Sequence, residues 1–260
     1  MTTTVRELQE RAARALPVEH SERVGGWWLH HAPACSWWVG TAQPHAEAGP
    51  RDLVRRVLAV EEFYGARDAS PCFQISPGAC PPGLDALLEE RGYAREGMMS
   101  LQTASITEVL ARTRAGTLRV RLADRLTPAW YEVWHAVHGH YGGDARAERA
   151  MLERAPRPVV YASALIGDDT VAAGRAVVDT GWAGLFSVAT LPHARGKGAA
   201  SNILAALAGW AALQDIERMY LQVEPDNLPA MRLYAQSGFE EVCAYHYRRG
   251  RALSVADRCS

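Results

Sequence analysis

The apolar and polar positions of the first half follow two different periods, and so predict a mixture of helices and strands. Apolar residues recur every three to four positions in three stretches, each of which ends beside a Pro or a Gly. Short apolar runs between Gly, Pro and Ser residues predict strands. Helices are therefore expected at Val5–Leu16, Arg51–Tyr64 and Leu84–Arg91, and strands at Gly25–His31, Ser36–Thr41, Pro71–Ser76 and Met98–Ala104.

The second half alternates between helices and strands over longer stretches. Thr127 followed by Pro128 is typical of a helix start, because Thr caps the first turn and Pro suits the first helical position. Three apolar runs follow one another, with turns at 167–169 and 180–181 between them, and predict three consecutive strands. The expected helices are Ala129–Val137, Asp144–Ala155, a stretch from near Gly198 to Leu213, and Pro229–Gln236, and the expected strands are Leu118–Leu122, Pro158–Ile166, Val171–Asp179, Trp182–Leu191, Met219–Val223 and Glu240–Arg248.

One turn in this half is suited to an anion. An apolar strand stops at Pro192, and the helix after it begins near Gly198. The first N–H groups of a helix have no partner within the helix, and the helix dipole favours negative charge there. Gly residues let a phosphate approach the backbone, and Arg195 and Lys197 add positive charge. The turn predicts a phosphate site, although the Lys-Ser/Thr pair of the Walker pattern is missing.

Two motifs in order carry a family resemblance. The first is Arg195, Gly198 and Ala200, preceded by Pro192, which matches an Arg/Gln-x-x-Gly-x-Gly/Ala loop. The second is Asn, then Ala three residues on, then Leu-Tyr and Gly-Phe, found here as Asn227, Ala230, Leu233, Tyr234, Gly238 and Phe239. Together they resemble the GNAT superfamily of acyl-CoA-dependent N-acyltransferases over about 118–249. The resemblance implies an α/β (α+β) fold with a mixed, mostly antiparallel sheet flanked by helices.

The resemblance also implies a site and a donor. Acetyl-CoA would serve as the acyl-donor cosubstrate, and the strand residues would pair with its pantetheine arm and polarise the thioester oxygen. The loop would hold its pyrophosphate, and Tyr234 would donate a proton to the departing thiolate. Asn227 would fix the cofactor arm or cap the next helix. The residues expected to bind the donor are Val188, Ala189, Thr190, Arg195, Gly196, Lys197, Gly198, Ala199, Ala200 and Asn227.

The general base is left open by the sequence. Some family members place a Glu where this chain has Gln222, which cannot accept a proton. Glu224 lies two residues further on and, in a strand, on the same face, so we take it as the candidate catalytic base. A second set consists of three histidines after the first helix, where the family binds its acceptor, and a water chain is a third possibility. That set is His135, His138 and His140, with Tyr141 beside it.

The end of the first half resembles the end of the second. Aligning Gly92-Tyr93 with Gly238-Phe239 places Leu88 opposite Tyr234, and the first half has no matching loop. We therefore expect two tandem domains, a degenerate GNAT-like domain at 1–116 that holds no acyl-CoA and a catalytic domain at 117–260. The polar stretch 105–117 is taken as the boundary. Chance similarity of a short helix–strand unit is the alternative.

Composition narrows the class of partner. The net charge of −1 gives no general attraction to nucleic acid or acidic membranes, and the longest apolar run, 203–213, is too short to span a bilayer. Five cysteines without paired spacing fit a reducing compartment and predict no metal site. We expect a cytoplasmic N-acetyltransferase, monomeric or homodimeric, that uses an amine acceptor of unknown identity. A non-catalytic acyl-CoA-binding or sensing module is the alternative, and a phosphate-ligand protein unrelated to CoA is a second.

Overall fold

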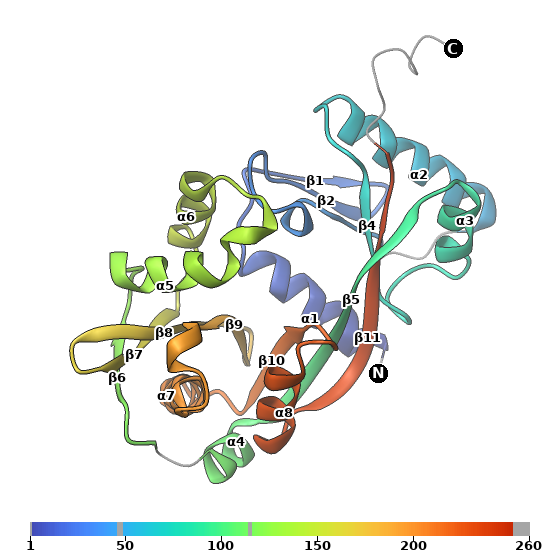
Figure 1. The fold of residues 1–260 in the computed structure, drawn as a ribbon. Coiled ribbons are helices and arrows are strands. Elements are labelled where there is room, and N and C mark those ends of the chain that lie inside the picture. The colour runs from blue at the N-terminus through green and yellow to red at the C-terminus, as the bar shows by residue number, and fades with distance from the viewer. Residues whose placement is uncertain (1, 46–48, 114–115, 252–260) are drawn as a thin grey trace. The chain divides into compact units, whose positions relative to one another are not determined.

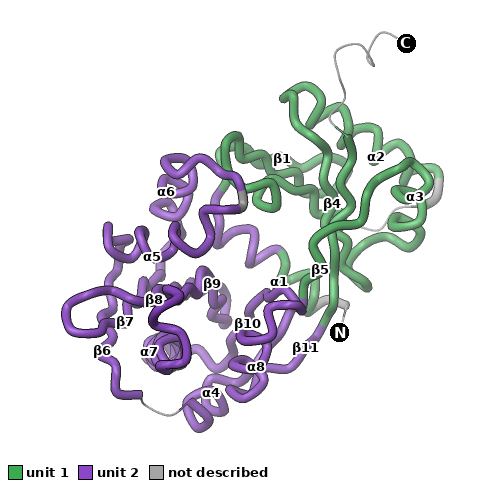
Figure 2. Tube along the Cα trace, in the orientation of Figure 1, with its two compact units in different colours: residues 1–9, 18–99, 243–260 green, residues 10–17, 100–242 purple. Residues whose placement is uncertain are grey.

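The computed structural model describes residues 2–45, 49–113 and 116–251 (Figure 1). They form two compact units (Figure 2). The described part of unit 1 comprises 2–9, 18–99 and 243–251, apart from the gap at 46–48, and that of unit 2 comprises 10–17 and 100–242, apart from 114–115. Three elements contribute residues to both units, namely α1 (Thr2–Arg14), β5 (Ala94–Ser105) and β11 (Glu240–Arg249).

Unit 2 is built on a mixed sheet with the strand order β5-β10-β9-β8-β7-β6. All neighbouring strands in it are antiparallel except β9 and β10, which are parallel. A parallel pair needs a crossover, and helix α7 (Ala199–Ala212) supplies it. The strands are β6 (Arg119–Ala123), β7 (Val159–Ile166), β8 (Asp169–Asp179), β9 (Trp182–Thr190) and β10 (Arg218–Val223).

One face of this sheet packs on α7, which is apolar almost all round and therefore deeply buried. Helices α4 (Ile106–Arg112) and α8 (Leu228–Gln236) complete that core, which includes Ile203 and Leu207. Helix α5 (Pro128–His138) packs on β8 and β9, and the Trp130 indole donates to the Gly174 carbonyl at 3.0 Å. The Thr127 hydroxyl caps α5, as expected. Helix α6 (Ala145–Glu153) follows.

The packing of α7 on β8 gives a stability prediction. A Cβ built on Gly174 lies 2.5 Å from the Ile203 Cγ2, whereas a Cβ on Gly209 in α7 meets nothing within 4 Å. Gly174→Ala should therefore destabilise unit 2 by about 1–3 kcal/mol through overpacking. The same change at Gly209 should stabilise it by about 0.5–1 kcal/mol, because Gly is a poor helix former. Denaturation midpoints of both variants test the pair, and a midpoint for Gly174→Ala at or above that of the parent contradicts the packing.

Unit 1 contains a sheet with the order β1-β2-β3-β4-β11. A β1–β2 hairpin joins a short β3, and β3 pairs in parallel with β4 through the crossover helix α2. The strands are β1 (His20–Val24), β2 (Trp27–His31), β3 (Ala42–Gln43) and β4 (Cys72–Ile75), and the helices are α2 (Pro50–Gly65) and α3 (Leu84–Glu90). A core of Trp27, Phe73, Leu84 and Leu88 lies between sheet and helices.

The two units share one topology. In each, a parallel pair is linked by a crossover helix, β3-α2-β4 in one and β9-α7-β10 in the other, and is followed by a short helix, α3 or α8. The final strands are exchanged: residues 100–105 of β5 pair with β10, and residues 246–249 of β11 pair with β4. The compact units therefore interleave along the chain instead of meeting at the expected boundary of 116/117. A fragment starting at residue 117 would lack the strand beside β10.

Three local predictions differ from the structure. Residues 36–41, expected as a strand, form a 3-10 turn at Trp37–Val39, where the Trp37 ring packs edge-on against Tyr247 at 5.2 Å. Residues 20–24, left without an element, form β1. The stretch 105–117, expected as a polar boundary, contains α4, because the Ser105 hydroxyl caps the helix and its apolar face is buried in the core of unit 2.

Candidate active site

The first feature of the site is an unpaired edge on β9. Its parallel pairing with β10 runs from Trp182 to Leu185 and stops there, although both strands continue. On the other side, Ala189 and Thr190 remain paired with β8 after a register shift. Ser187, at this shift, has φ +59°, a left-handed value that is uncommon for a residue with a side chain. Backbone groups of 186–190 on the β10 side are thus available to an extended ligand.

The second feature is the turn that follows β9. Gly196 and Gly198 both have left-handed φ, +75° and +79°, and Gly198 is the N-cap of α7. The first intrahelical bond is donated by the Asn202 N–H to the Gly198 carbonyl, so the N–H groups of Ala199, Ala200 and Ser201 have no acceptor within the helix. The first turn of α7 carries no acidic residue. This geometry favours an anion.

The residues of strand and turn fit an acyl-CoA. A Cβ added at Gly196 would meet nothing within 4 Å, so the backbone there is open to a ligand. The Thr190 hydroxyl is a buried polar atom without a hydrogen-bond partner in the described part of the chain. The exposed Arg195 donates from Nε to the Thr190 carbonyl at 3.5 Å, which ties the turn to the strand end. Lys197 is exposed beside it.

Tyr234 lies on α8 and is 6% exposed. Its ring packs edge-on against Phe239 at 5.7 Å, and burial raises the pKa of the phenol. A buried phenol of this kind stays protonated, which is the state that a proton donor needs. Asn227 caps α8 by accepting from the Ala230 N–H at 3.3 Å, so the capping role expected for it is present.

Gln222 and Glu224 lie on either side of the end of β10, which stops at Val223. Glu224 is therefore outside the strand, and the alternation that placed both residues on one strand face does not extend to it. Both side chains are partly exposed. The Glu224 carbonyl accepts the Asn227 N–H at 3.1 Å, which closes the turn between β10 and α8.

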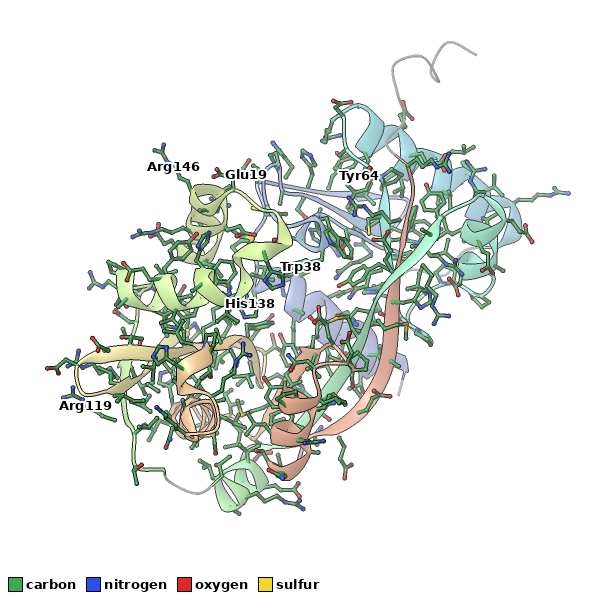
Figure 3. All side chains as sticks on the ribbon, viewed as in Figure 1. Glu19, Trp38, Tyr64, Arg119, His138 and Arg146 are labelled. Carbon is green, nitrogen blue, oxygen red and sulfur yellow. The ribbon has the colours of Figure 1, made fainter. Side chains whose placement is uncertain are left out.

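The structure brings one of the three histidines to the strand. His138 is the last residue of α5 (Figure 3). Its Nε2 lies 3.4 Å from the Val188 carbonyl oxygen. Its ring also packs against Trp134 at 5.8 Å, and burial lowers its pKa. His135 contacts the Tyr131 ring instead, and His140 is exposed. The sequence placed the three histidines in one group. Only the position of His138 at the end of the helix distinguished it from the other two.

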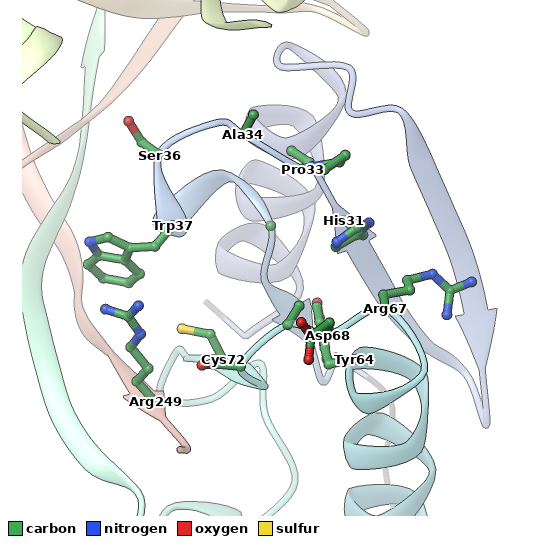
Figure 4. A pocket seen from close by; sticks show the side chains of 14 residues that line it. His31, Pro33, Ala34, Ser36, Trp37, Tyr64, Arg67, Asp68, Cys72 and Arg249 are labelled. Carbon is green, nitrogen blue, oxygen red and sulfur yellow. The ribbon is translucent and has the colours of Figure 1, made fainter. Parts of the chain in front are cut away.

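The described part of unit 1 does not show the features of this site. The first turn of α2 contains Asp52, whose charge disfavours an anion at that helix end. A cavity of about 330 Å³ does occur in unit 1 (Figure 4). It lies beside the C-terminal end of α2 and the start of β4, between Trp37, Asp68, Cys72 and Arg249. The cavity of unit 1 thus lies at the C-terminal end of its crossover helix α2. In unit 2, by contrast, the crossover helix α7 presents its free N–H groups at its N-terminal end.

Comparison with known proteins agrees with this geometry. Residues 120–239 match the sequence model of the acetyltransferase (GNAT) family. Over 250 residues the chain is 26% identical to YobR, an uncharacterized N-acetyltransferase of Bacillus subtilis (strain 168), with 94% of this chain and 98% of that protein covered. A GCN5-related N-acetyltransferase from Kribbella flavida has a TM-score of 0.73 at 17% identity, with 99% and 98% covered. A tandem GNAT protein from the clavulanic acid biosynthesis pathway has a TM-score of 0.64 at 16% identity, with 96% and 87% covered.

The fold is a mixed, mostly antiparallel sheet flanked by helices, as in these solved structures. Residues 120–239 match the GNAT family, and this match together with the relative supports an acyl-CoA-dependent N-acyltransferase that acetylates an amine. Within the described ranges, no group of three or more His, Cys, Asp or Glu side chains is placed to hold a metal ion. None of the helices described is long and apolar enough to cross a bilayer.

Proposed function

We propose that this enzyme uses acetyl-CoA as its acyl donor and transfers the acetyl group directly to the primary amine of a small molecule or protein. The observation that carries the proposal is the continuity of the open edge of β9 with the free N–H groups of α7. A ligand with an amide-rich arm and a pyrophosphate matches that sequence of backbone groups. Acetyl-CoA supplies the activated thioester when it is bound.

Each residue of the site has a proposed role in binding the donor or in catalysis. Val188, Ala189 and Thr190 offer backbone groups to the pantetheine arm, and an N–H of this strand stabilises negative charge on the thioester oxygen. Arg195, Gly196, Lys197, Gly198, Ala199 and Ala200 hold the pyrophosphate. The phenol of Tyr234 gives its proton to the departing sulfur. Glu224 remains a candidate base, at the end of β10, and Asn227 positions the donor arm as well as capping α8.

Unit 1 binds no acyl-CoA under this proposal. Its crossover helix has an acidic first turn, and Leu88 occupies in α3 the place that the repeat assigns to Tyr234 in α8. A non-catalytic acyl-CoA sensor would share the donor site but would release no thiol.

Acetyl-CoA should bind once per chain and raise the melting temperature. Ligand at a hundred times its dissociation constant stabilises the native state by about 2.7 kcal/mol, because it binds only folded protein. Calorimetry gives the stoichiometry, and a panel of amines assayed for acetyl-CoA-dependent thiol release tests the reaction. Two molecules bound per chain contradict the assignment of unit 1. Binding without amine-dependent thiol release across the panel favours the sensor.

A further inference from the structure

The structure places the imidazole of His138 in contact with the backbone of β9, the proposed donor-binding strand. Its Nε2 lies 3.4 Å from the carbonyl oxygen of Val188, next to the register shift in β9. A carbonyl oxygen only accepts hydrogen bonds, so a neutral ring in this contact carries its hydrogen on Nε2. The lone pair, and with it the ability to take a proton, is then on Nδ1.

We infer that His138 is the general base of the acetyl transfer and takes the proton from the acceptor ammonium. This inference rests on the proposed function and deepens it, because the base was assigned to Glu224 from sequence. The contact with Val188 supports it in two ways: it fixes the ring beside the strand that carries the thioester, and its carbonyl oxygen stabilises the imidazolium that forms.

The surroundings favour a neutral imidazole before the reaction. Burial lowers the pKa of His138, the Val188 carbonyl opposes that effect, and His140 adds a smaller lowering. Strand β9, which packs against α5, carries no ionisable side chain from Trp182 to Thr190. The ionisable side chains of the other strands that pack on α5 are Tyr161, Asp169, Arg175 and Asp179. A neutral ring can accept a proton at pH 7, whereas an exposed His beside a carboxylate would already be partly charged.

The proton transfers of the reaction balance with His138 and Tyr234 as the groups that carry them. His138 takes one proton from the ammonium, and the neutral amine nitrogen bonds to the acyl carbon. As the bond from that carbon to sulfur breaks, the sulfur takes the proton of the Tyr234 phenol. The nitrogen loses its second proton, which restores the phenol, and His138 releases its proton to solvent. The products are the amide, the free thiol and one proton.

The test compares two acceptors that differ in the need for a base. The first is the best alkylamine of the panel, for example benzylamine. The second is the hydrazine in which an NH group replaces the CH2 group next to the amine, for example phenylhydrazine. The alkylamine is an ammonium at pH 7 and must lose a proton, whereas the hydrazine is already neutral. His138→Gln keeps an N–H donor for the Val188 carbonyl but cannot take a proton. His135→Gln, on the same helix, is the matched control.

With the alkylamine, His138→Gln should lower kcat/KM at least about a hundredfold, as removal of a general base does. With the hydrazine the loss should stay within about threefold, because the step that general-base catalysis accelerates is absent. The parent enzyme should lose activity toward the alkylamine as pH falls through the lowered pKa of His138, since the base works only when neutral. His138→Gln should lack this acid limb of the pH–rate profile. His135→Gln should retain both the kcat/KM of the parent and its acid limb.

Equal losses with both acceptors overturn the inference and make His138 a structural residue. An unchanged acid limb in the variant does the same. Failure of the parent enzyme to release thiol with any amine overturns the proposed function itself, which separates the two failures. Acetyl-CoA-induced stabilisation of His138→Gln, measured by thermal denaturation, should match the parent and shows that the variant is folded and binds the donor.

Discussion

Gly198→Asp is expected to weaken acetyl-CoA binding strongly while the chain stays folded. Gly198 is the N-cap of α7, and the added carboxylate would stand where the free N–H groups attract the pyrophosphate. Repulsion between unit charges about 4 Å apart ranges from about 1 kcal/mol in water to about 4 kcal/mol near a protein surface, so binding should weaken by about five- to a thousandfold. Titration calorimetry and ligand-induced melting shifts measure the loss.

Two controls separate charge from shape and from strain. Gly198→Asn adds nearly the same side chain without the charge, and should weaken binding much less. Gly167→Asp makes the identical change at another left-handed glycine, in the β7–β8 turn, where an added Cβ meets nothing within 4 Å, whereas at Gly198 it lies 3.7 Å from the Asn202 Nδ2. It should bind acetyl-CoA as the parent does. Undiminished binding by folded Gly198→Asp contradicts the placement of the pyrophosphate at this helix.

The turn between β9 and α7 could be predicted because its sequence signals are local. A glycine needed for a left-handed turn, a proline at the end of a strand and a basic residue before a helix all lie within ten residues of one another. The structure forms that turn with Gly196 and Gly198 at positive φ. Helix α4 had a local signal too, because Ser105 and Glu108 have the spacing of a capping box, and the polar neighbours concealed it.

The remaining features depend on pairs distant in sequence. Apolar alternation identifies β5 and β11 as strands, but it does not state which strand each will pair with, and the exchange between the halves follows from that choice. The contact of His138 with Val188 joins residues 50 apart. Trp37 illustrates the same limit locally: its aromatic run resembles a strand, yet packing against Tyr247 and Arg249 accompanies a 3-10 turn there.

Tyr234→Phe should keep acetyl-CoA affinity and lower turnover by roughly tenfold or more, which is the low end of what a general acid contributes. The substitution removes only the hydroxyl, so the ring can still pack against Phe239 and within the core of unit 2. The phenol donates no hydrogen bond that the structure shows among the described residues, and its loss should therefore cost little stability. We expect only the low end of this rate effect because a thiolate, whose conjugate acid has a pKa of about 8.5, is a fairly good leaving group without protonation.

The test measures both kcat and the dissociation constant of acetyl-CoA for Tyr234→Phe and for the parent enzyme. A proton donor that acts only as sulfur departs changes kcat and leaves the dissociation constant alone. Phe239→Leu, which alters the neighbouring ring and keeps the phenol, is the matched control and should retain turnover within a small factor. Turnover of Tyr234→Phe at the parent rate would make Tyr234 a packing residue, and the proton would then come from water. A fall in both turnover and affinity would place the hydroxyl in donor binding.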